Sequence, residues 1–110
     1  MKNESFTIKN WDASDRPREK LILKGKRALS DAELIAILIG SGNRKESAVE
    51  LSKRILAHCH NNLGKLFQMS LSELEEFRGI GEAKAVSILT GLELGKRLRM
   101  ADTIKQDKIT

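Results

Sequence analysis

The sequence of 110 residues has little of several residue types: it contains one cysteine, one proline, one tryptophan and no tyrosine. The single cysteine, Cys59, excludes a disulfide within the chain and is typical of a reducing compartment. The longest apolar run, residues 34–39, is far shorter than the roughly 20 residues that span a bilayer, and residues 1–5 contain no signal-peptide core. We therefore expect a soluble, cytoplasmic protein without a membrane partner.

Long runs of like charge are also absent. The chain has 20 Lys and Arg against 15 Asp and Glu, a net charge of +5, and the two signs are interspersed. This charge permits a polyanionic partner without requiring one. The length favours one domain with a modest core. Because proline and aromatic residues are scarce while Leu, Ile, Ala, Glu and Lys are abundant, we expect helix throughout.

The most informative stretch is residues 69–89, which reads as a helix, a glycine turn and a second helix. Ser70 and Glu73 have the spacing of a capping box, so a helix should begin at Leu71. It should end by Gly79, because Gly79 and Gly81 allow a tight backbone that other residues resist. The next helix then begins with free N–H groups beside two glycines, which is a favourable place for an anion.

This stretch resembles the helix-hairpin-helix motif, in which Phe77, Gly79, Ile80, Gly81, Lys84, Ala85 and Ile88 fill the pattern. The resemblance implies binding of the DNA backbone through main-chain N–H groups, without reading of base sequence. Ile80 would fill the space between the helices, and Lys84 would add a counter-charge for phosphate. Glu82 departs from the pattern and would weaken phosphate binding. The alternative is a helical corner that only packs.

Residues 29–59 look like a second, degenerate copy of the same unit. Ser30 and Glu33 form another capping-box pattern, and Gly40-Ser41-Gly42 occupies the place of the later glycine turn. Polar Ser41 replaces the hydrophobic plug, while Arg44 and Lys45 place charge beside the turn. We therefore expect tandem helix-hairpin-helix units, 29–59 and 69–99, although a chance match in a leucine-rich chain would give the same pattern.

The N-terminal quarter of the chain combines an arm, a short helix and a basic region. Residues 1–14 form an arm whose Phe6, Ile8 and Trp11 could contact the body, and residues 15–25 form a short helix. Arg16 and Arg18 open the most basic region of the chain, which could contact DNA or only keep the domain soluble.

Residues 61–68 form a connector helix, and the last helix runs from about Glu82 to Arg99. Gly91 and Gly95 within that helix suggest close approach by another helix, because each costs about 1 kcal/mol of helix propensity relative to alanine. In residues 100–110 the apolar residues no longer follow the helical period, so we expect a linker there.

His58-Cys59-His60 is not predicted to bind metal. On a helix, side chains two residues apart point about 200° away from each other, so two imidazoles could not share one ion while the helix persists. No acidic ligand completes the set, and no Ser-His-Asp arrangement or paired-carboxylate pocket stands out. We expect neither a catalytic residue nor a cofactor in this chain.

Residues 7–99 as a whole resemble the N-terminal domain of the RadC family. The resemblance rests on Arg16-Pro17-Arg18-Glu19-Lys20-Leu21, the segments 29–34, 36–42 and 79–85, and Glu93-Leu94-Gly95-Lys96-Arg97. It implies a fragment of a DNA repair protein that continues into a JAMM-type, zinc-metallopeptidase-like domain bearing a His-x-His-Pro-Ser-Gly signature, so the full-length protein could be an enzyme that binds zinc.

The sequence thus predicts an all-α domain of about five short helices, residues 15–99, that binds DNA without sequence preference. One alternative is an interaction or positioning module for the C-terminal domain, and another is a part that only holds a macromolecular substrate for a metallopeptidase. The predicted DNA-binding residues are Gly79, Ile80, Gly81, Lys84, Gly40, Ser41, Gly42, Arg44, Lys45, Arg16 and Arg18.

Overall fold

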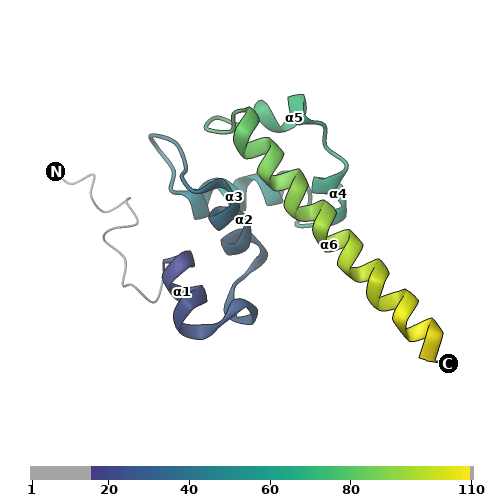
Figure 1. Ribbon diagram of the computed structural model, residues 1–110. Helices are drawn as coiled ribbons and strands as arrows, with labels where there is room; N and C mark the ends of the chain where they lie inside the picture. Colours follow the sequence, from purple (N-terminus) through teal and green to yellow (C-terminus); the bar gives the residue numbers. More distant parts are fainter. Residues whose placement is uncertain (1–15, 110) are drawn as a thin grey trace.

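The computed structural model describes residues 16–109, and the side chains of residues 16–103. In this part the chain forms six α-helices and one 3-10 turn, and no strand (Figure 1). The elements are α1 Pro17–Lys24, the 3-10 turn Lys26–Ala28, α2 Asp31–Ile39, α3 Ala48–His58, α4 Leu63–Phe67, α5 Leu71–Glu75 and α6 Glu82–Ile109. The predicted all-α class is confirmed, with one helix more than expected. The predicted arm, 1–14, with Phe6, Ile8 and Trp11, lies outside the described residues.

Capping residues define where the helices begin. Both predicted capping boxes are present, Ser30 with Glu33 at α2 and Ser70 with Glu73 at α5. A third box, Ser47 with Glu50, starts α3 and was not predicted. In each box the serine hydroxyl accepts from one backbone N–H and the glutamate accepts from another, so two donors that the helix leaves unsatisfied are paired.

The core lies where α2, α3 and α6 meet, with α4 and α5 closing its ends. In Figure 1, α6 runs from beside α5 past α2, α3 and α4. Gly91 explains part of this packing, because a Cβ there would stand 2.9 Å from Leu38 Cδ1 on α2. The expected close approach of another helix is therefore found at Gly91, while Gly95 faces open space. The largest completely buried side chains among the described residues are Leu51, Ser52, Ile55, Leu66, Leu74 and Ile88.

The last helix is longer than the sequence suggests. We expected it to end near Arg99, but α6 continues to Ile109, and its C-terminal part extends away from the other helices (Figure 1). The described residues of α6 are exposed from Leu94 onward, so the helix leaves the core before Arg99, and the loss of the apolar period after Arg99 does not mark the end of the helix. Among the described residues, no helix combines the length and apolar character that crossing a membrane requires.

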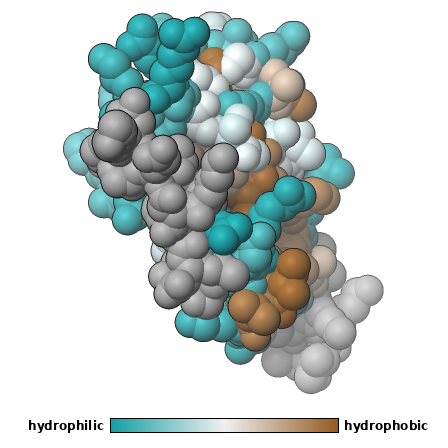
Figure 2. All heavy atoms as spheres, turned by 90° about the vertical axis from the view of Figure 1, so that its left-hand side faces the viewer, coloured by the Kyte–Doolittle hydropathy of each residue, from teal (hydrophilic) through white to brown (hydrophobic). Residues whose placement is uncertain are grey.

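α1 packs on α2 through an ion pair. Lys20 Nζ lies 3.0 Å from Glu33 Oε2, so one cation of the predicted basic region serves the fold. Burial raises the pKa of Glu33, but hydrogen bonds from the Ser30 N–H and from Lys20 outweigh burial and leave this pKa below its usual value. On the outer side of α1, Ile22 and Leu23 are exposed. Figure 2 views the molecule from the left-hand side of Figure 1. On this face, patches of apolar residues (brown) lie between hydrophilic residues (teal).

Candidate nucleic-acid interface

Two glycine loops, far apart in the sequence, lie side by side. The first glycine loop (residues 40–47) joins α2 to α3, and the second glycine loop (residues 76–81) joins α5 to α6. Asn43 Nδ2 in the first loop donates to the Arg78 carbonyl of the second at 2.9 Å. At Gly79 an added Cβ would stand 3.0 Å from Asn43 Cβ. The loops that the sequence treats as two sites therefore form one continuous surface.

Lys84 ties the two loops together. Its Nζ donates to the Ser41 carbonyl at 2.8 Å, to Ser41 Oγ at 3.0 Å and to the Gly42 carbonyl at 3.3 Å. An ammonium group has three donors, so these contacts use all of them. In this arrangement Lys84 is a link within the fold, not the free counter-charge that the sequence suggested. The polar Ser41, which looked like a defect in the first copy, is the acceptor that Lys84 requires.

Asn43 organises the first loop, and sequence analysis missed this role. Its Oδ1 accepts from the backbone N–H groups of Lys45 and Glu46, both at 2.8 Å. Its Nδ2 donates to Glu46 Oε1 as well as to Arg78, and its own N–H donates to the Glu46 carbonyl. An asparagine after a glycine is typical of a turn in which the side chain bonds the backbone two residues on. That signal was present, but the partner in the other loop could not be read from it.

Glu46 is neutralised within the fold. Arg54 donates to its carboxylate through Nε at 2.8 Å and Nη2 at 2.9 Å. The Arg54 hydrogen bond lowers the pKa of Glu46, Asn43 lowers it further, and burial opposes both. Arg54 also lies over the Phe77 ring, 5.7 Å from its centroid. The Glu46 carboxylate therefore already accepts hydrogen bonds from Arg54 of α3 and from Asn43.

The four glycines of the loops have different roles. Gly40 and Gly79 have φ angles of 79° and 97°, the left-handed region that favours glycine. At Gly42 an added Cβ would overlap the Glu46 carbonyl oxygen and lie 2.6 Å from the Ser47 oxygen. Gly81 has neither constraint, because its added Cβ meets no atom within 4 Å in the part of the chain that the structure describes. An added Cβ at Gly40 also meets no described atom within 4 Å, so among these four glycines only Gly81 combines open space with a backbone that other residues can adopt.

The start of α6 presents unsatisfied donors. The first backbone bond of this helix is from Ala85 to the Gly81 carbonyl at 3.0 Å. The N–H groups of residues 81–84 have no hydrogen-bond partner among the described residues. Ile80 is buried beneath them at 4% exposure, in the plug position that the motif predicts. Glu82 is exposed at the first position of α6, where its charge favours the helix and opposes an anion.

Unpaired cations surround a hollow at the junction of the loops. Arg44 and Lys45 of the first loop and Arg78 of the second line it together with Asn43. None of these three cations forms an ion pair with another described residue. Arg78 was not among the predicted site residues, because nothing in its local sequence distinguishes it from other surface arginines. Arg16 and Arg18 line a different hollow, beside Gly40 and Ala48.

The His58-Cys59-His60 segment differs from the predicted geometry. α3 ends at His58, and His60 has a left-handed φ of 56°, so the angle of about 200° between helical side chains does not apply to this pair of histidines. The His58 ring packs edge-on against Phe77, with centroids 5.4 Å apart. Cys59 is buried, which raises the pKa of its thiol. Among the described residues there is no group of three or more metal-ligating side chains.

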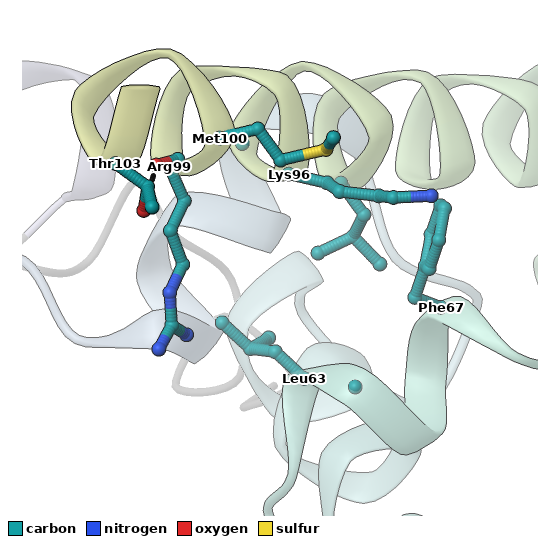
Figure 3. Close-up of a pocket in the computed structure, with 9 residues that line it drawn as sticks. Leu63, Phe67, Lys96, Arg99, Met100 and Thr103 are labelled. Atoms are coloured by element: carbon teal, nitrogen blue, oxygen red, sulfur yellow. Dashed lines mark hydrogen bonds between the residues drawn. The ribbon is translucent and has the colours of Figure 1, made fainter. Parts of the chain in front are cut away.

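A separate apolar groove lies between α4 and α6 and has a volume of about 650 Å³. Figure 3 shows Arg99 extending from α6 toward Leu63, and Lys96 extending toward Phe67. The Lys96 Nζ lies 5.6 Å from the centroid of the Phe67 ring. The floor includes Gly95, which has open space above it. The groove is lined by Leu63, Gly64, Phe67, Leu92, Gly95, Lys96, Arg99, Met100 and Thr103.

Comparison with known proteins places this domain. Residues 8–86 match the family model described as UPF0758 N-terminal. The chain is 63% identical over its whole length to a UPF0758 protein of Flavobacterium johnsoniae, of which it covers 48%. It is 47% identical over 96% of its length to a UPF0758 protein of Porphyromonas gingivalis, of which it covers 47%. No solved structure matches it significantly.

The chain thus spans about half the length of these curated relatives. The match to an N-terminal family model supports the resemblance to the N-terminal region of the RadC family. The chain therefore belongs to the UPF0758 family, through its N-terminal domain.

Proposed function

We propose that this chain, itself non-catalytic, binds DNA through the phosphate backbone, without reading base sequence, at the face where the two glycine loops meet. The observation that carries the proposal is the open approach to the α6 N-terminus. Gly81 leaves space above the unpaired N–H groups of residues 81–84. Such N–H groups, with the positive end of the helix dipole, bind phosphate oxygens.

The charges at the neighbouring junction of the two loops support the same function. Arg44, Lys45 and Arg78 lie at the junction of the loops without ion-pair partners among the described residues. Phosphate contacts fix a protein on DNA but carry no base information, so a surface of backbone amides and cations favours binding without sequence preference. The local pattern of residues 69–89 resembles a helix-hairpin-helix unit, and this resemblance implies phosphate binding through main-chain N–H groups.

We expect Gly81→Asp to weaken binding to a duplex at least tenfold while leaving the fold intact. Aspartate is a favoured N-cap residue, so its carboxylate should occupy the free N–H groups of α6 without loss of stability. The matched control is Thr90→Asp, which adds the same charge to an exposed position of α6, roughly 13 Å along the helix at 1.5 Å per residue. Fluorescence anisotropy with a labelled duplex at several salt concentrations measures the affinity.

A steep fall of affinity with salt in the unmodified chain is also expected, because phosphate contacts release counterions. If the chain binds no duplex at low salt, or if both aspartate variants weaken binding equally, the proposed phosphate contact at Gly81 is wrong.

The groove between α4 and α6 favours a second candidate function, the positioning of another domain. The curated relatives are about twice as long as the part that this chain matches. Because the matching family model is an N-terminal one, the rest of each relative should follow the segment that corresponds to α6. Leu98 and Met100 of α6 are 65% and 53% exposed. We propose that the C-terminal half of the full-length proteins, which the RadC resemblance implies is metallopeptidase-like, packs into this groove.

Hydrogen exchange tests the groove in the Flavobacterium johnsoniae relative, compared as full-length protein and as N-terminal half. We expect slower exchange in the full-length protein for the segments aligned with α4 and with residues 92–103, because packing reduces local opening. Exchange that is equal in the two forms would exclude this docking.

A further inference from the structure

We infer that Arg44, Lys45 and Arg78 form a second phosphate-binding site, at the seam between the two glycine loops and separate from the α6 N-terminus. The inference rests on the proposed function and names a contact beyond the glycine turn. The site takes one phosphodiester group of the backbone that also reaches Gly81. Its lining comes from both loops, so it exists only where the loops are joined.

The hollow has the chemistry of a phosphate site. Two guanidinium groups present planar forks of donors that match phosphate oxygens, and Lys45 adds an ammonium. The carboxylate of the same loop does not neutralise them, because Glu46 is held by Arg54 and Asn43. Lys84 is likewise committed to Ser41 and Gly42. Glu46 and Lys84 are thus satisfied within the loops, whereas these three cations have no ion pair with a described residue.

Without an anion the three cations add no ion pair to the stability of the fold, and their mutual repulsion is weak because all three side chains are exposed. Cations gathered around one hollow repel each other, and no ion pair with a described residue offsets the repulsion. Features that lower stability without a compensating contact are expected at functional sites. A bound phosphate would supply the missing negative charge. Removal of one cation should therefore leave the melting temperature of the free domain unchanged or slightly higher.

Asn43 is a positioning residue for this site. Its Nδ2 bond to the Arg78 carbonyl holds the backbone of the second loop against the first. Its Oδ1 fixes the N–H groups of Lys45 and Glu46, which orients the segment carrying Arg44 and Lys45. The backbone that carries the three cations is therefore set by one hydrogen-bond network around Asn43, before any ligand arrives.

The test compares Arg44→Ala and Arg78→Ala with Arg97→Ala. Arg97 is an exposed cation on α6 paired only with Glu93, so its loss changes the net charge equally, and it lies roughly 22 Å along the helix from Glu82 at 1.5 Å per residue. We expect each of the first two variants to weaken duplex binding about fivefold to twentyfold. The slope of log affinity against log salt should fall by about 0.9 for each lost phosphate contact. Arg97→Ala should change the affinity less than twofold.

A titration with inorganic phosphate, followed by amide NMR signals, separates this site from DNA binding. Saturable shifts at residues 44, 45 and 78 that disappear in Arg78→Ala are expected. If the unmodified chain shows these shifts but binds no DNA, the site stands and the proposed function fails. If the chain binds DNA while Arg44→Ala and Arg78→Ala behave like Arg97→Ala, the seam site is overturned and the proposed function stands.

Discussion

Gly42→Ala is expected to lower the free energy of unfolding by at least about 4 kcal/mol, an exceptional loss for one methyl group. The added Cβ would overlap the Glu46 carbonyl oxygen and lie 2.5 Å from the Ser47 carbonyl carbon. These are backbone atoms that cannot move freely, because the Glu46 carbonyl accepts from the Asn43 N–H and Ser47 caps α3. Thermal unfolding followed by circular dichroism should show a melting temperature lower by roughly 20 °C.

Gly81→Ala is the control for this prediction. Its Cβ meets no described atom within 4 Å, so we expect a loss below about 1 kcal/mol, the difference between glycine and alanine at an N-cap. The predicted role of Gly42 is wrong if the two variants unfold at the same temperature.

Asn43→Asp is expected to lower the free energy of unfolding by about 2 kcal/mol at neutral pH. The substitution removes both side-chain donors and leaves the Arg78 carbonyl without its partner. It also places a carboxylate beside Glu46 Oε1, which now lies 2.8 Å from Asn43 Nδ2. The bond to the Arg78 carbonyl is exposed, so its loss costs about 0.5–1.5 kcal/mol, the net contribution of a typical hydrogen bond. The two carboxylates in contact add to this loss. Urea denaturation measures the change.

The matched control is Asn62→Asp. Asn62 caps α4 by accepting from the Lys65 N–H at 2.9 Å, and aspartate performs the same role. We expect this variant to stay within about 0.5 kcal/mol of the unmodified protein. Equal losses at positions 43 and 62 would show that the seam between the loops does not depend on Asn43.

Local signals explain which parts of the fold could be predicted from the sequence. Ser30 with Glu33, and Ser70 with Glu73, act within three residues of each other, so their spacing alone locates the starts of α2 and α5. The buried position of Ile80 follows in the same way from its place between two glycines. Each of these features involves residues only a few positions apart, so the sequence alone is enough to predict it.

The seam could not be predicted in this way. The Lys84 contact with Ser41 joins residues 43 apart, and the Asn43 contact with Arg78 joins residues 35 apart. Their existence depends on how α2, α3 and α6 pack, which no local pattern specifies. Sequence reasoning therefore found the glycine loops but assigned Lys84 to a ligand, and it overlooked Arg78. It also took the end of the apolar period for the end of α6, although that period reports burial and not helicity.

The uninterrupted course of α6 has a mechanical consequence. This helix begins at the second glycine loop and contains 28 residues, which at 1.5 Å per residue is a rod of roughly 42 Å. A rod of this kind fixes both a distance and a rotational phase between the loops and anything carried at its far end. One residue inserted in the exposed part of α6 would turn that end by about 100°, whereas seven would lengthen the rod and nearly restore its original bearing.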